Sequence, residues 1–104
     1  MTIFPGETEI HEFLIPFSSA SLQKAVASYK QYDYITLDVE TTTFTDVEDN
    51  VCKACFSLTQ NQTLQLRNIP QCEVQINVLT IHNERFTSEP MMVQVGEQFY
   101  RHAM

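Results

Sequence analysis

Residues 73–80 read Glu-Val-Gln-Ile-Asn-Val-Leu-Thr, in which the apolar residues Val74, Ile76 and Val78 are separated by polar ones. Successive side chains of a β-strand point to opposite faces, so this alternation predicts a strand with one face toward a core. The same period of two dominates the rest of the chain, and no segment keeps helical spacing over the length of a well-defined helix. The chain is therefore expected to consist mainly of β-strands.

Similar segments lie on both sides of this strand. We expect strands at residues 9–15, 22–30, 34–40, 51–58, 73–80 and 85–95, with an extended edge piece at 41–45. Pro90 predicts a break or bulge in the last strand, because proline cannot donate to the ladder. Acidic residues 46–50 are expected to turn the chain into strand 51–58, and residues 59–64 to form one short helical turn that Thr59 caps.

The segment 20–30 leaves two folds open. Ala25, Ala27 and Tyr29 alternate as in a strand, but Leu22, Ala25, Val26 and Tyr29 also fit one face of a helix. We favour a strand, because residues 31–33 form a plausible hairpin turn into 34–40. About seven short strands joined by polar turns predict an all-β, Ig-like antiparallel β-sandwich as a single domain over 1–104. The alternative is a small α+β fold with a helix at 20–30.

Composition excludes several classes of protein. The 104 residues are 43% hydrophobic and carry a net charge of −7, with no basic cluster to neutralise phosphates, so nucleic-acid binding is not expected. No apolar run has the length of a membrane span, and the N-terminus lacks the basic and apolar regions of a signal peptide. We expect neither a membrane protein nor export through a signal peptide.

The three cysteines are Cys52, Cys55 and Cys72, and an odd number does not suggest a disulfide framework. Cys52 and Cys55 have the spacing of a redox or zinc pair. On a strand, however, residues three apart point to opposite faces, so we expect one buried thiol and one half-exposed thiol. No metal site or cofactor is predicted.

Other polar residues do not assemble a catalytic motif. The acidic stretch Asp38, Glu40, Asp46, Glu48 and Asp49 lacks the glycine and distal glutamate of a calcium loop, and it is interpreted as a solvated edge. His11 alternates with apolar residues and is expected to be a partly buried strand residue, while His82 lies in a predicted turn. An enzyme is therefore not expected.

A cluster of tyrosines is the best candidate for a contact surface. Tyr29, Tyr32 and Tyr34 surround one predicted hairpin, and tyrosine offers a large contact area at low entropic cost. The competing interpretation is that these rings cover a sheet face and a turn.

Four segments of the chain resemble a group of known proteins: residues 58–64 (Leu-Thr-Gln-Asn-Gln-Thr-Leu), the strand that begins at Val74, and residues 13–17 and 85–88. They resemble short uncharacterised proteins of phages and prophages of Gram-positive bacteria, which are encoded among tail and other structural genes. The resemblance implies a virion-associated role, in the virion or the bacterial cytoplasm, and carries over no catalytic residue.

The function expected from these observations is that of a non-enzymatic structural or adaptor protein. Its partners would be other virion proteins or further copies of itself, contacted through sheet edges and apolar faces. The alternative is a small module that binds a carbohydrate or a cation through the tyrosine hairpin or the acidic stretch.

Overall fold

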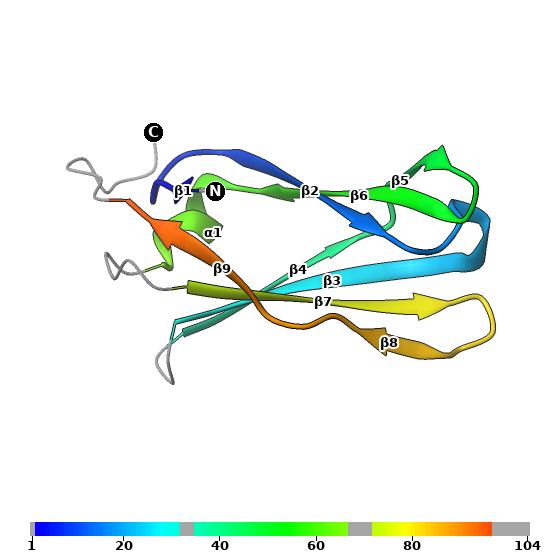
Figure 1. Cartoon of the computed structure of the whole chain (residues 1–104). Helices are drawn as coiled ribbons and strands as arrows, with labels where there is room; N and C mark the ends of the chain where they lie inside the picture. Colours follow the sequence, from blue (N-terminus) through cyan, green and yellow to red (C-terminus); the bar gives the residue numbers. More distant parts are fainter. Residues whose placement is uncertain (1, 32–34, 67–71, 97–104) are drawn as a thin grey trace.

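The computed structural model describes residues 2–31, 35–66 and 72–96, which form two facing β-sheets (Figure 1). The larger sheet has the order β1 (Thr2–Ile3), β9 (Met91–Val95), β7 (Cys72–Thr80), β3 (Leu22–Gln31) and β4 (Ile35–Thr41), and β8 (Arg85–Thr87) pairs with β7. The smaller sheet has the order β2 (Glu9–Ile15), β6 (Val51–Leu58) and β5 (Phe44–Glu48). Neighbouring strands are antiparallel except for β1 and β9.

This strand order is that of an Ig-like sandwich. The second, fifth and sixth strands form one sheet, and the first, third, fourth, seventh, eighth and ninth strands form the other. The chain crosses from β6 to β7 through α1 (Gln60–Leu64). The expected all-β, Ig-like fold is confirmed, with nine strands among the described residues where about seven were predicted.

The alternation in the sequence places the core between the sheets. The inward residues of β7 and β6 are buried, including Val74, Ile76 and Val78 from the first and Cys52, Ala54 and Phe56 from the second. They belong to one hydrophobic cluster that also takes in β3, β4 and β9. The prediction that side chains alternate along these strands is confirmed.

Residues 22–30 lie in strand β3, as favoured from the sequence. β3 lies inside the larger sheet and pairs with both β4 and β7, so it gains a ladder on each side. Ala25, Ala27 and Tyr29 are buried on its inner face. A short 3-10 turn, Ser19–Ser21, precedes it in place of a helix.

The expected helical turn is also confirmed. Thr59 is the N-cap of α1 and forms a capping box with Gln62: the Gln62 amide donates to Thr59 Oγ1 at 3.2 Å, and the Thr59 amide donates to Gln62 Oε1 at 2.8 Å. These bonds satisfy orphan amides of the first turn, which accounts for a helix of only one turn at this point.

One local prediction is wrong. Residues 46–48 were expected in a turn but belong to β5, and the turn is confined to Asp49 and Asn50, with Asn50 at φ 59°. Asparagine tolerates this left-handed conformation, so two residues suffice to reverse the chain. The expected hairpin turn at 31–33 lies largely outside the described residues.

β1 is a strand that sequence analysis did not predict. Its two residues pair in parallel with Gln94 and Val95, and the Gly96 amide donates to the Ile3 carbonyl at 2.7 Å. The Phe4 ring occupies the space beside Gly96, 2.4 Å from where a Cβ would stand, so a side chain at position 96 would require the ring to move. The start of the described chain is therefore held on the larger sheet, and β2 is left as an edge of the smaller one.

Candidate functional site

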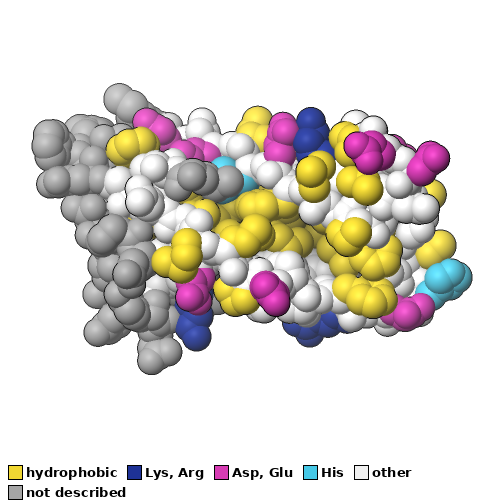
Figure 2. Space-filling view, in the orientation of Figure 1, with side chains coloured by type: hydrophobic (Ala, Val, Ile, Leu, Met, Phe, Trp, Pro, Cys, Tyr) yellow, Lys and Arg dark blue, Asp and Glu magenta, His cyan; other side chains and the backbone are white. Residues whose placement is uncertain are grey.

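An apolar groove opens between the two sheets on the side of β2. Its volume is about 420 Å³, and its lining comes from β2 and the residues after it, from β7, and from β8 to the start of β9. The apolar lining residues are Phe13, Leu14, Ile15, Pro16, Phe17, Ile76, Val78, Phe86 and Met91. Figure 2 has the orientation of Figure 1, and in it hydrophobic side chains gather across the centre of the face.

The position of the first strand explains why the core is open here. In an Ig-like sandwich the first strand commonly lies beside the second. In this chain β1 pairs with β9, and no described strand covers the free edge of β2. The inner residues Ile76 and Val78 of β7 therefore line the groove as well as the core.

Residues 88–90, which separate β8 from β9, shape the wall of the groove that lies opposite β2. Ser88 Oγ accepts a hydrogen bond from the Ile76 amide at 2.9 Å, and the Ser88 amide donates to the Ile76 carbonyl at 2.8 Å. These bonds keep the chain on β7 where the ladder is interrupted. β8 thereby presents Phe86 toward β2, and its ring packs on Phe17 with centroids 5.0 Å apart.

Large apolar side chains also lie exposed around this opening. Ile10 and Leu14, on the outer face of β2, are 68% and 70% exposed, the highest values among the exposed large hydrophobic residues. Phe86 is 44% exposed on the other side. The groove lining, which includes exposed Leu14 and Phe86, is an apolar surface that we call the β2 surface, whereas Ile10 lines a separate polar hollow beside the start of β2.

The residues of this surface were not predicted as a site. A signal was present in residues 13–17, Phe-Leu-Ile-Pro-Phe, which are apolar at every position. A strand with one buried face needs only alternate apolar residues, so the others are available for contact outside the core. The opposite wall comes from residues 76–91, and a local pattern does not show that the fold brings the two together.

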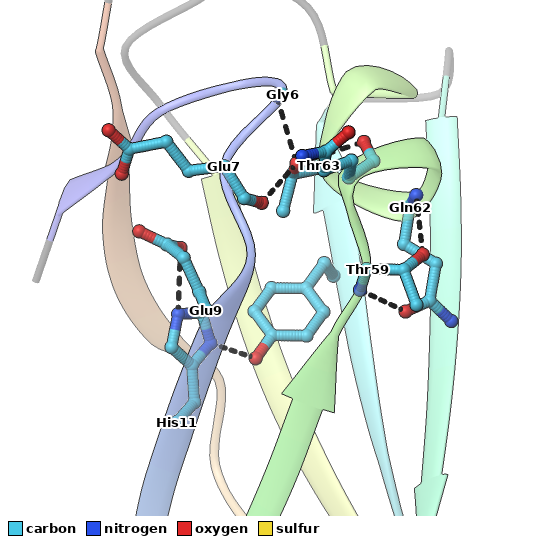
Figure 3. A network of polar contacts seen from close by, with 9 residues as sticks. Gly6, Glu7, Glu9, His11, Thr59, Gln62 and Thr63 are labelled. Carbon is cyan, nitrogen blue, oxygen red and sulfur yellow. Dashed lines mark hydrogen bonds and ion pairs between the residues drawn. The ribbon is translucent and has the colours of Figure 1, made fainter. Parts of the chain in front are cut away.

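A buried polar network lies beside the core, away from the groove (Figure 3). His11 Nε2 lies 3.1 Å from Glu9 Oε2, and His11 Nδ1 is hydrogen-bonded to the Tyr29 hydroxyl. A carboxylate only accepts, so when the His11 ring is neutral Nε2 carries the proton and Nδ1 accepts from Tyr29. Burial, and secondarily the charges of Cys72 and Glu9, raise the pKa of Tyr29 above its ordinary value, which keeps the hydroxyl protonated.

Tyr29 corrects the predicted contact patch of Tyr29, Tyr32 and Tyr34. It is fully buried, because it lies on the inner face of β3, and its hydroxyl is used within the core. It is therefore not available to a partner. Tyr32 and Tyr34 lie outside the described residues.

The cysteines lie as the strand geometry predicts. Cys52 is buried and Cys55 half-buried, on opposite faces of β6, and Cys72 is buried on β7; all three are free thiols. Burial raises the pKa of Cys72 to about 11 and also raises the pKa of Cys52. The two buried thiols are therefore poor nucleophiles at neutral pH.

Three acidic residues of the expected edge, Asp46, Glu40 and Asp38, each contact a different partner rather than converging on one site. Asp46 accepts from the Ser19 amide and hydroxyl, both at 2.7 Å, and these bonds lower the pKa of Asp46. Glu40 lies 3.3 Å from Lys24 Nζ, and Asp38 accepts from Ser28 at 2.6 Å. Within residues 2–31, 35–66 and 72–96, no group of three or more His, Cys, Asp or Glu side chains is arranged to hold a metal ion.

A second hollow, on the outer face of the larger sheet, is polar. Asp38, Glu40, Lys24, Asn77 and Arg85 are among its lining residues. Arg85 donates two hydrogen bonds to Asn77 Oδ1, at 3.0 and 3.2 Å, so this hollow is lined by groups that already pair with one another.

In the part of the chain that is described, no helix is long and apolar enough to cross a membrane.

Comparison with known proteins finds similar solved structures but no matching family. No protein-family model and no curated protein matches the chain. Among solved structures, that of the NK cell receptor Nkp44, described as a triggering partner in natural cytotoxicity, superposes with a TM-score of 0.49 at 12% sequence identity. The match covers 92% of this chain and 95% of the receptor chain. The resemblance to phage and prophage proteins is not tested by these comparisons and stays a prediction.

Proposed function

We propose that the protein is a non-enzymatic structural or adaptor module that docks on another protein through the β2 surface. The observation that carries this proposal is the apolar groove of about 420 Å³, whose floor is part of the hydrophobic core and whose rim includes Leu14 and Phe86. Contiguous apolar surface of this kind is costly to leave in water, and it marks interaction sites on folded proteins.

The chemistry of the lining supports a docking role over catalysis. Its hydroxyl groups are those of Thr87 and Ser88, and Ser88 Oγ already accepts from the Ile76 amide. His11 contributes no atom to the lining and is hydrogen-bonded to Tyr29 and Glu9. The lining therefore offers apolar contact area, with no nucleophile beside a base.

The resemblance of residues 58–64 and 74–80 to phage and prophage proteins supports a virion as the setting. In that setting the partner is another structural protein of the particle. An Ig-like sandwich with an uncovered edge suits such a role, because exposed sheet edges and apolar faces are natural sites of assembly.

Site-specific photo-crosslinking in purified particles tests the proposal. A photo-reactive phenylalanine analogue replaces Phe86 in the groove or, as the control, exposed Thr45 on β5 at the far edge of the smaller sheet. We expect the protein in the particles and a crosslink to another virion protein from position 86, with none from position 45. Absence of the protein from the particles, or equal crosslinking from both positions, would overturn the proposal.

A further inference from the structure

We propose that the partner binds by adding an extended β-strand to the free edge of β2, with an apolar half against the groove and a Lys- or Arg-bearing half beside the start of β2. This inference rests on the proposed docking function and specifies its partner.

The free edge of β2 supplies the backbone groups for such a strand. β2 pairs with β6 along its whole length, Glu9 to Ile15, and no described strand pairs with its other side. In a strand with one neighbour, alternate residues direct their amide and carbonyl groups away from that neighbour. An added strand would satisfy these groups, which is how β-augmentation gains affinity.

The groove supplies the side-chain contacts. A strand at the usual spacing of about 4.8 Å from β2 lies over the opening between the sheets. Its inward side chains would meet Phe13, Ile76 and Phe86, and its outward ones would lie beside Leu14. A strand with apolar residues at alternate positions therefore fits both the ladder and the groove.

Charge divides the site along β2. The apolar lining comes from residues 13–17, whereas a polar hollow beside the first half of the strand is lined by Glu7, Glu9 and Glu12 among others. Lys53 lies 3.2 Å from Glu12, and His11 Nε2 lies 3.1 Å from Glu9, so the three carboxylates of this hollow share one lysine and one histidine. An incoming strand with Lys or Arg at this end and apolar residues at the other matches the distribution of charge.

The same charges disfavour a second copy as the occupant. A second copy carries another net charge of −7, and its own β2 brings Glu9 and Glu12 to the contact. If two β2 strands pair antiparallel around their midpoint, Glu12 faces Glu12 of the other copy. Like charges directly opposite one another destabilise a strand pair. A basic strand from another protein avoids this repulsion.

Binding of labelled peptide pools to the intact protein tests the inference. The peptides are about nine residues long, enough to span Glu9 to Phe17 in extended form. In one half of each peptide Val, Ile or Phe alternates with Thr, and in the other half Lys or Arg alternates with Thr. Peptides are made with the basic half first and with the apolar half first, so that parallel and antiparallel addition to β2 are both tested. Two control pools keep the length: one clusters the apolar residues so that alternation is lost, and one replaces Lys and Arg with Glu.

We expect one order of the basic alternating pool to bind about tenfold or more tighter than either control, measured by fluorescence anisotropy. Binding should slow amide hydrogen exchange in β2. It should be lost in Phe86→Asp and kept in Met92→Asp, because Met92 is 61% exposed but lies outside the groove lining.

Several outcomes would overturn strand addition. These are equal binding of either control pool, binding without protection of β2, no binding of either order, or a homodimer that protects β2 in sedimentation and exchange measurements. If any of these results is obtained while position 86 still crosslinks to a virion protein, the proposed docking function stands and strand addition to β2 is wrong. If that crosslink is absent as well, both the docking function and strand addition are wrong.

Discussion

Tyr29 brings a hydroxyl group into an apolar interior, and His11 accepts its hydrogen bond from the opposite sheet. The contact joins β3 to β2 across the sandwich, and Glu9 fixes the other ring nitrogen of His11. A buried polar group costs free energy when it loses its partner, so the two residues are expected to depend on each other.

We predict that Tyr29→Phe lowers the free energy of unfolding by about 1–3 kcal/mol, because it leaves His11 Nδ1 buried without a donor. The double variant Tyr29→Phe with His11→Leu removes both polar groups and should lose less than the two single variants added together. Urea denaturation of the four proteins measures this. Strictly additive effects would show that the contact contributes nothing of its own.

The thiols should differ in reactivity because they differ in burial. We expect a small alkylating reagent to modify the native protein at half-buried Cys55, and to reach buried Cys52 and Cys72 only in denaturant. Mass spectrometry of labelled peptides gives the sites. Modification of Cys72 at the rate of Cys55 under native conditions would contradict the burial of β7.

Alkaline pH should weaken the fold through Cys72. Its pKa rises from 9.0 in the unfolded chain to about 11 in the folded one, chiefly through burial. Below pH 9 both states keep the proton. Between pH 9 and 11 the unfolded state binds fewer protons, so the free energy of unfolding falls as pH rises. Cys72→Ala should remove this part of the fall, while Cys55→Ser should keep it, in urea denaturation from pH 8 to 11.5; identical profiles would contradict the assignment.

At the scale of elements, α1 holds the chain that leads into β2. Thr63 is fully buried: its Oγ1 accepts from the Gly6 amide at 2.9 Å and donates to the Glu7 carbonyl at 2.8 Å. Figure 3 shows Thr63 between the helical turn and this segment. One side chain therefore connects an element late in the chain to the approach of β2.

We predict that Thr63→Val, which keeps the shape but removes the hydroxyl, lowers the free energy of unfolding by about 1–3 kcal/mol. Thr45→Val on exposed β5 is the matched control and should change it by less than about 0.5 kcal/mol. Urea denaturation compares them. If both variants unfold at the same denaturant concentration, α1 does not anchor this segment.

Period-two patterning predicts elements well where a strand has one buried face, as in β6 and β7. It is ambiguous for β3, because Ala25 and Tyr29 belong both to a strand face and to a possible helix face, and the two neighbouring strands decide the outcome. It does not reveal β1, since two residues show no period, or the strand assignment of residues 46–48, where acidic side chains on an exposed edge resemble a turn.

At the scale of the whole molecule, the candidate site is a consequence of topology. β1 joins the larger sheet, β2 is left as an edge, and the groove lies between β2 and β8. Each wall looks like ordinary core or turn sequence by itself, so the sequence cannot predict their meeting. The tyrosines illustrate the opposite error: Tyr29 resembles a contact residue in sequence, yet the inner face of β3 buries it.

Incorporation of Phe86→Asp into purified particles, compared with Met92→Asp, tests the central claim that the β2 surface is a docking site. Met92→Asp should unfold at a midpoint close to that of the parent protein, whereas Phe86→Asp loses the packing of its ring on Phe17, so urea midpoints are measured first and the comparison uses variants that are folded. We predict that Phe86→Asp falls at least about tenfold in particles, since a charge in the groove must be desolvated on docking, and that Met92→Asp is incorporated normally. Equal incorporation of the two folded variants would contradict the claim.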